Sequence, residues 1–140
     1  MLWGTGNVKT AITDRSDIGQ YVARILADSR TLNRYVFIWG EEVTLNEVIA
    51  LAEKALGKKL EFPHVSSKEL DQRIENSEVY IHYALEFKRS MWVRGDNTIA
   101  NAKRPEYGDA LDVQELYPDF KPRKLESIMY EFASRLQKNK

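Results

Sequence analysis

The amino-acid sequence predicts an α/β protein with a few short parallel strands and surrounding helices. Over residues 1–65, segments with strand character alternate with segments of helical period, which is typical of parallel βαβ units. Residues 66–140 are mainly helical in pattern, with an irregular stretch at 94–123. We therefore expect one structural unit, with the end of an α/β region at 1–65 and a mainly helical region at 66–140.

The first strand and the first helix are expected between residues 8 and 27. Apolar and polar residues alternate over residues 8–13, which indicates a short strand. Asp14 and Asp17 are good helix starters, because a short side-chain oxygen can accept from a free amide of the first turn. The apolar residues that follow have helical spacing, so we expect a helix over residues 17–27.

A second strand, a helix and a third strand are expected to follow. The run Tyr35–Trp39 is apolar without alternation, and its aromatic and β-branched content favours a strand covered on both faces. Thr44 and Glu47 have the spacing of a capping box, and Gly57 stands where a left-handed helix end is expected. Residues 59–65 then predict another strand.

The second half of the chain has the pattern of three helices and a long loop. Ser66 and Glu69 form a second candidate capping box. Apolar residues line up along a longer helix at 77–92 and along a closing helix at 125–136. The stretch 94–123 contains glycines and prolines without a clear period, so we expect a long loop. A loop of that length is usually functional or lacks its neighbours.

The composition excludes several classes of function. Lys+Arg and Asp+Glu both number 21, so the charge balance predicts neither nucleic-acid binding nor attachment to an anionic membrane. The absence of cysteine excludes disulfides, thiolate catalysis and cysteine-bound zinc. His64 and His82 are the two histidines and stand alone, so no metal site is expected. With no secretory pattern and no long apolar run, we expect a cytoplasmic protein.

Several ordered segments resemble the isoflavone-reductase and NmrA-like family. The clearest is the V-R-G-D-N-T stretch at 93–98, followed by E-L-Y-P-D-F-K at 115–121. The upstream segments D-I-G at 17–19, D-S-R-T-L-N at 28–33 and G-K-K-L at 57–60 also resemble the family pattern, in the right order. The resemblance therefore covers nearly the whole chain.

The resemblance implies an atypical short-chain-dehydrogenase fold, of which this chain looks like the C-terminal, substrate-side part only. In that family an N-terminal Rossmann half carries a G-x-x-G-x-x-G turn that holds NADP or NAD. This sequence has no such turn, because Gly4-Thr5-Gly6 is too short and no strand precedes it. The family's catalytic lysine has no counterpart here either. We therefore assign no catalytic, cofactor-binding or metal-binding residue, and expect the chain alone to bind no cofactor.

The best candidates for a substrate pocket are Tyr83, Phe87, Met91 and Trp92. They belong to the helix that, by resemblance, faces the substrate, and aromatic walls suit a flat or apolar small molecule. The alternative is that they pack against the missing Rossmann half as core residues. That half and a small-molecule substrate are the expected partners.

Other polar segments favour structural interpretations. Glu41 and Glu42 are expected in a solvated acidic turn, and the basic cluster at 121–124 at a solvated helix start. For Arg94-Gly95-Asp96 a turn is expected, with Asp96 accepting from the amides that follow it. Cell adhesion through this tripeptide is not expected.

Three interpretations of function remain open. The first is a C-terminal fragment of an NAD(P)H-dependent oxidoreductase that supplies the substrate pocket and covers the nicotinamide. The second is an NmrA-like regulator that senses the dinucleotide without turnover. The third is a non-functional truncated fragment. The sequence leaves the substrate, the choice between NADH and NADPH, and the oligomeric state open, and we expect the chain alone to be inactive.

Overall fold

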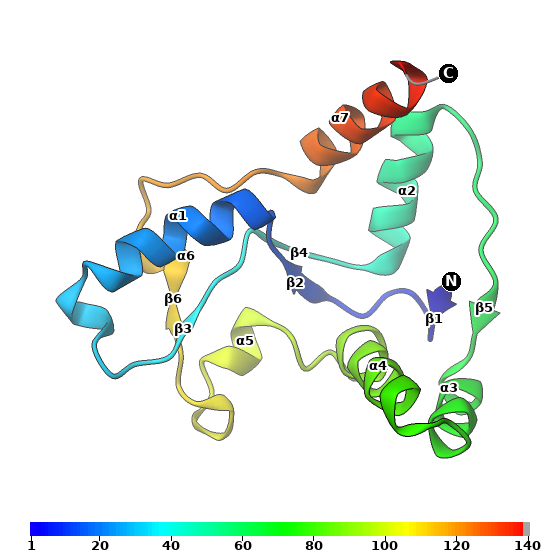
Figure 1. Cartoon of the computed structure of the whole chain (residues 1–140), viewed down its shortest axis with the longest axis horizontal. Coiled ribbons are helices and arrows are strands. Elements are labelled where there is room, and N and C mark those ends of the chain that lie inside the picture. Colours follow the sequence, from blue (N-terminus) through cyan, green and yellow to red (C-terminus); the bar gives the residue numbers. More distant parts are fainter. Residues whose placement is uncertain (139–140) are drawn as a thin grey trace.

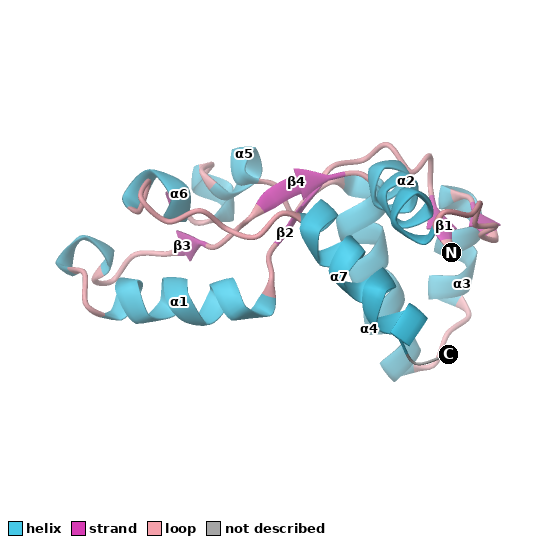
Figure 2. Ribbon diagram, turned by 90° about the horizontal axis from the view of Figure 1, so that it is seen from above, coloured by secondary structure: helices cyan, strands magenta, loops and turns pink. Residues whose placement is uncertain are grey.

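The computed structural model describes residues 1–138 and shows an extended arrangement of helices around three short strand pairs (Figures 1 and 2). The strands are β1 Leu2–Trp3, β2 Thr10–Ile12, β3 Val36–Phe37, β4 Glu41–Val43, β5 His64–Val65 and β6 Leu111–Asp112. The helices are α1 Arg15–Leu26, α2 Leu45–Leu56, α3 Ser67–Glu75, α4 Val79–Arg89, α5 Ile99–Ala102, α6 Val113–Leu116 and α7 Leu125–Lys138. Shorter turns are η1 Ser29–Thr31, the π-helical η2 Ser90–Arg94 and η3 Pro105–Tyr107.

The strands form three separate two-stranded ladders. β1 runs parallel to β5, with Leu2 opposite His64. β3 runs parallel to β6, with Val36 opposite Leu111. β2 and β4 are antiparallel, with Thr10 opposite Val43. In the view of Figure 1 the β2–β4 ladder lies between α1 on one side and α2 on the other.

The expected short parallel strand pairs are present as β1–β5 and β3–β6, but neighbouring strands do not pair as the predicted βαβ units require. The strands expected at 8–13, 35–39 and 59–65 do form, as β2, β3 and β5, but within residues 1–138 none of them pairs with another. Each pairs instead with β4, β6 or β1, which are only two or three residues long. Strands that short have no measurable period, so the alternation of strands and helices gave their order but not their partners.

The helix starts agree with the sequence more closely. The Thr44–Glu47 capping box is confirmed in both directions, because the Thr44 amide donates to Glu47 Oε2 at 2.7 Å and the Glu47 amide donates to Thr44 Oγ1 at 3.2 Å. α2 ends at Gly57 in the left-handed conformation, with φ of 66°. α1 starts two residues earlier than expected, with Asp14 as its cap. Asp17 is instead buried, and its Oδ2 accepts from the Arg123 amide at 2.7 Å.

Two further expectations need correction. The helix expected at 77–92 begins at Val79 and changes from α to π geometry after Arg89. The stretch 94–123 is not a structureless loop, since it contains α5, η3, β6 and α6. These elements are only two to four residues long, in a stretch interrupted by glycine and proline. Their local sequence pattern is therefore weak, and tertiary contacts hold them in place. Among the described residues, no helix has the length and apolar character needed to cross a membrane.

The molecule has two small hydrophobic cores. The first joins Tyr21 of α1 with Val113 and Tyr117, and β3 packs against it. The second joins Val65 with Leu70 and Ile74 of α3, with Val93 packed against it. Figure 1 shows β5 and α3 at the opposite end of the molecule from α1 and α6. Residues from both halves of the sequence therefore meet in the first core.

The hydroxyl group of Tyr21 is a testable feature of the first core. The residue is 0% exposed, and its hydroxyl is a buried polar atom without a hydrogen-bond partner in the structure. Burial raises the pKa of this phenol, with a further contribution from the charge of Asp17. An unsatisfied buried hydroxyl costs roughly 1–3 kcal/mol of desolvation.

We therefore expect Tyr21→Phe to leave the free energy of unfolding unchanged or to raise it by about 1 kcal/mol, because the ring keeps its packing while the unpaired group is lost. Urea denaturation followed by circular dichroism measures this difference. Tyr117→Phe is the matched control, because its hydroxyl donates to Asp28 Oδ2 at 3.0 Å and its loss should be destabilising. A clear loss of stability in Tyr21→Phe would show that the hydroxyl has a partner.

Asp28 connects the end of α1 to the segment after β6. Its carboxylate accepts from the Arg30 side chain, the Arg30 amide and the Tyr117 hydroxyl. The hydrogen bond from the Arg30 side chain, followed by that from the Arg30 amide, holds the pKa of Asp28 far below its ordinary value of 3.8. A carboxyl with a depressed folded-state pKa stabilises the fold above its unfolded-state value, and this contribution is lost as the pH falls.

Asp28→Asn should therefore reduce stability near neutral pH, and its difference from the wild type should shrink as the pH falls below 3.8. Urea unfolding at a series of pH values between about 6 and 2.5 measures the two curves. A difference that stays constant over this range would contradict a role for the Asp28 charge.

Candidate functional site

A cavity of about 450 Å³ is formed where three segments of the chain meet. One wall is the start of β3, a second is the end of α4 with η2, and the third runs from the Asp96 loop through α5 and η3 to residue 110. Figure 1 shows α5 between β3 and α4. The lining residues are Tyr35, Val36, Phe37, Phe87, Ser90, Met91, Asp96, Asn97, Thr98, Ala102, Tyr107 and Ala110.

Aromatic side chains from distant segments line much of this cavity. Tyr35 and Phe37 come from the β3 segment, Phe87 from α4 and Tyr107 from η3. Gly108 permits the close approach of the Tyr35 ring, because a Cβ at position 108 would lie 3.0 Å from a ring carbon. Gly108 also has φ of 98°, which a residue with a side chain rarely adopts. Aromatic walls of this kind suit a flat, largely apolar molecule.

The polar edge of the cavity is held by hydrogen bonds within the protein. Asp96 Oδ2 accepts from Ser90 Oγ at 2.9 Å and from Arg94 Nε at 2.8 Å. Asn97 Nδ2 donates to Thr10 Oγ1 at 2.9 Å and to the Ala11 carbonyl at 2.8 Å. These contacts connect the cavity edge to β2, so the polar groups fix the shape of the site.

The charge of Asp96 is stabilised where it lies. Burial alone raises the pKa of this carboxyl, but the hydrogen bonds from Arg94 and Ser90 outweigh burial and give a pKa below the ordinary value of 3.8. Asp96 therefore carries a negative charge at neutral pH. The hydrogen bonds that the Asp96 carboxylate was expected to accept from the amides that follow it are not found, because the carboxylate accepts from Ser90 and Arg94 instead.

The structure places the four predicted pocket residues in two groups. Phe87 and Met91 line the cavity, and their role in binding stays a prediction. Tyr83 is 71% exposed on α4, and neither it nor Trp92 is among the lining residues. Tyr35 and Phe37 were missed as pocket residues, although their spacing of two residues on a strand places them on one face.

The acidic pair at the end of the apolar run has a structural role that the sequence analysis missed. Glu41 and Glu42 were expected in a solvated turn, but they form β4 with Val43. The Glu41 carboxylate accepts from the Leu125 amide at the start of α7. Glu42 Oε1 accepts from the Ile99 amide at the start of α5 at 2.8 Å. Each glutamate therefore satisfies the first turn of a helix that is distant in sequence.

The other polar groups singled out from the sequence are tied to the protein. His64 Nε2 lies 2.7 Å from the Gly4 carbonyl, and His82 Nδ1 lies 3.2 Å from the Ile74 carbonyl. Within residues 1–138, no group of three or more potential ligands is arranged to hold a metal ion. The Arg123 side chain pairs with Asp14 and Glu131, so the basic cluster at 121–124 is not simply a solvated helix start.

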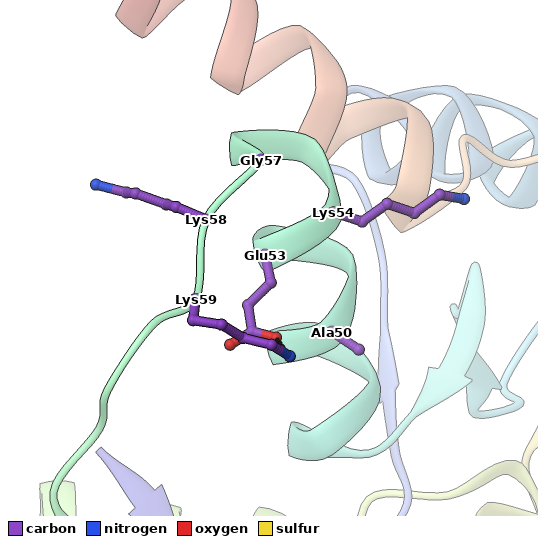
Figure 3. A pocket seen from close by; sticks show the side chains of 6 residues that line it. All are labelled: Ala50, Glu53, Lys54, Gly57, Lys58 and Lys59. Carbon is purple, nitrogen blue, oxygen red and sulfur yellow. Dashed lines mark hydrogen bonds and ion pairs between the residues drawn. The ribbon is translucent and has the colours of Figure 1, made fainter.

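A second hollow of about 440 Å³ lies at the C-terminal end of α2 (Figure 3). Lys59 Nζ is 2.7 Å from Glu53 Oε2, and the Leu60 amide donates to Glu53 Oε1 at 2.9 Å. Lys54 points to the other side of the helix, where it pairs with Glu126 of α7 at 2.7 Å, and Lys58 points away from Glu53. The lysines stabilise the end of the helix, which makes this hollow a weaker candidate than the aromatic cavity.

The strand-to-helix junctions of the described chain do not fit a dinucleotide. A pyrophosphate needs free amides at a helix N-terminus and a glycine turn that lets it approach. Here α1 is capped by Asp14 and α6 by Asp112. The first turns of α2 and α3 carry Glu47 and Glu69, next to capping Thr44 and Ser66. Acidic side chains thus occupy each junction and would repel a phosphate.

The sequence profile of the NmrA-like family matches residues 4–129. An isoflavone reductase homolog P3 from Arabidopsis thaliana is 34% identical over 132 residues, which are 93% of this chain and 41% of the relative. Phenylcoumaran benzylic ether reductase Betv6 from Betula pendula is 34% identical over 135 residues, 95% of this chain and 43% of the relative. The chain therefore spans about two fifths of the length of these relatives.

Solved structures agree with this assignment. A crystal structure of isoflavone reductase superimposes with a TM-score of 0.78 at 31% identity, over 94% of this chain and 42% of that chain. The NADPH complex of leucoanthocyanidin reductase from Vitis vinifera gives a TM-score of 0.82 at 24% identity, over 96% and 46% respectively, and supports the fold alone. The profile match and the similar fold together show that this chain belongs to the NmrA-like family.

Proposed function

We propose that this chain is the substrate-side portion of an NAD(P)H-dependent reductase, and that its aromatic cavity receives the substrate. The observation that carries the proposal is the cavity itself, which Phe87 and Met91 line together with aromatic residues of the β3 segment and η3. The acidic strand-to-helix junctions support the complementary half of the proposal, that another portion of the protein holds the nucleotide. The C-terminal position of this portion within the family chain stays a prediction.

The names of the relatives favour reduction of a small aromatic molecule. They include reductases of an isoflavone and of a phenylcoumaran benzylic ether. A further structure, AtPrR2 with NADP⁺ and (+)-pinoresinol, superimposes with a TM-score of 0.76 at 31% identity. This chain brings the matching chemistry, because an aromatic cavity stabilises a flat ring by stacking and by removing its faces from water.

The proposed role of the chain is to bind and orient. Phe87 and the β3 aromatic residues would contact the faces of the substrate, while the groups at the polar edge already have partners within the protein. The cavity walls would also exclude water from the substrate, which is the usual role of a cover over a nicotinamide. The proposal gives none of the described residues a role in moving protons.

The first test measures binding of a flat aromatic probe, 2-naphthol, to the 140-residue chain. We expect ¹H–¹⁵N NMR titration to shift amides of β3, η2 and α5. Phe87→Ala should raise the dissociation constant roughly tenfold, because losing an aromatic contact costs on the order of 1.4 kcal/mol of binding free energy.

The matched control for this titration is Phe132→Ala. Phe132 and Phe87 have similar exposures of 56% and 61%, but Phe132 lies on α7 and does not line the aromatic cavity. An equal loss of affinity in both variants, or shifts confined to α7, would show that the probe binds exposed apolar surface in general. Either result would remove the cavity from the proposal.

The second test concerns the nucleotide. Because acidic residues occupy the described helix N-termini, we expect isothermal titration calorimetry to detect no micromolar binding of NADPH to the 140-residue chain. Micromolar binding would assign the nucleotide site to this chain and overturn its substrate-side role. In a protein that contains both portions, oxidation of NADPH supports the reductase, and binding without oxidation supports a dinucleotide sensor.

A further inference from the structure

One wall of the aromatic cavity is built from a π-helical turn. η2 follows α4 directly, and the Gly95 amide donates to the Ser90 carbonyl at 3.0 Å, which is the i to i+5 bond of a π turn. The Asp96 amide donates to the same carbonyl at 3.1 Å. The Ser90 hydroxyl in turn donates to Asp96 Oδ2 at 2.9 Å. We call these three hydrogen bonds the Ser90–Asp96 latch.

π turns are rare and usually occur singly within α-helices, often at functional sites. This turn stands between two packed regions. Ser90 and Met91 line the aromatic cavity, while Val93 packs against the core around Val65. The wider turn changes the rotation of the backbone over these few residues. Its geometry therefore decides how Met91 enters the cavity while Val93 stays in the core.

The exit of the turn is fixed by neighbouring segments. Gly95 has φ of 74°, and a Cβ at this position would lie 3.1 Å from Val8 Cγ1. Asn101 Nδ2 donates to the Gly95 carbonyl at 3.0 Å and to the Asp96 carbonyl at 3.2 Å, which anchors the loop to α5. The latch joins this anchored loop to Ser90, the first residue of the π turn, so it connects the loop to the cavity wall.

The Arg94–Asp96 ion pair contributes less to the stability of the π turn than the Ser90 hydroxyl does. The Arg94 side chain is half exposed, and such pairs contribute about 0–1 kcal/mol. The Ser90 hydroxyl is part-buried beside the cavity, where a lost hydrogen-bond partner costs more.

We propose that Ser90 and Asp96 are positioning residues that hold the π turn and thereby set which ring size the cavity accepts. The inference rests on the proposed substrate pocket, because it assigns a specificity role to one of its walls. Without the latch, the turn relaxes towards α-helical geometry and Met91 rotates relative to the aromatic rings. The cavity then loses its fit to a two-ring ligand more than to a one-ring ligand.

The experiment uses the 140-residue chain and four variants. Ser90→Ala and Asp96→Ala remove the side-chain bond of the latch, and Ser90→Thr restores a hydroxyl at the same position. Ser77→Ala is the matched control, because the Ser77 hydroxyl is also part-buried and donates to the Ile74 carbonyl at 2.8 Å, away from the cavity. Thermal unfolding of each variant checks that the fold is retained.

Two measurements are made on each variant. ¹³C-methyl NMR records nuclear Overhauser effects between the Met91 methyl group and the aromatic protons of the cavity. Titrations with phenol and 2-naphthol give the ratio of their dissociation constants. We expect Ser90→Ala and Asp96→Ala to lose the Met91 contacts and to change the ratio by at least about fivefold, and Ser90→Thr and Ser77→Ala to resemble the wild type.

Unchanged Met91 contacts and an unchanged ratio in Ser90→Ala and Asp96→Ala would overturn the positioning role. A uniform weakening of both probes, with Met91 in place, would also overturn it, because a specificity element must change the ratio. If Asp96→Ala unfolds, Ser90→Ala with its Ser90→Thr rescue still decides the question. If the wild type binds neither probe, the proposed substrate pocket fails, whereas the Met91 contacts still test the latch.

Discussion

The arrangement of this chain depends on carboxylates that accept backbone amides from distant segments. Strands of two or three residues supply few ladder hydrogen bonds, so other acceptors must hold the helices in place. Glu41 and Glu42 on β4 accept the first amides of α7 and α5, and Asp17 on α1 accepts the amide of Arg123. Charge-assisted bonds of this kind are stronger than neutral ones, and they satisfy helix ends that would otherwise be unpaired. A second set of acidic side chains occupies the first turns of α1, α2, α3 and α6, and it makes those junctions unsuitable for a phosphate.

The sequence predicted the parts of the fold that are encoded locally. The Thr44–Glu47 capping box, the left-handed Gly57 and the closing helix are each specified within one or two turns of chain, and all three are present. Strand pairing was not predictable in this way. β3 pairs with β6 across more than seventy residues, and the same two segments are joined by the hydrogen bond from Trp39 Nε1 to Asp112 Oδ1 at 2.8 Å. A two-residue strand carries no periodic signal of its own.

The candidate site shows the same difference between features encoded locally and features that depend on distant contacts. Helical spacing and the family resemblance singled out Tyr83, Phe87, Met91 and Trp92, of which Phe87 and Met91 line the cavity and the other two do not. Tyr35 was treated as part of a buried strand, and Tyr107 as part of a loop, because nothing local shows that the Tyr35 ring packs against Gly108, next to Tyr107. The resemblance could not supply the π turn either, since one extra residue in a turn leaves the apolar pattern of α4 almost unchanged.

The two small cores determine where the aromatic cavity lies. The core around Tyr21 and the core around Leu70 are formed by different elements. The aromatic cavity has one wall from each region, because β3 packs against the first core and η2 contributes Val93 to the second. A cavity between two independently packed regions changes shape when either wall changes, while each core keeps its own packing. Substitutions in the cavity walls should leave the scaffold in place, because the residues that form the carboxylate-to-amide bonds between helices do not line the cavity.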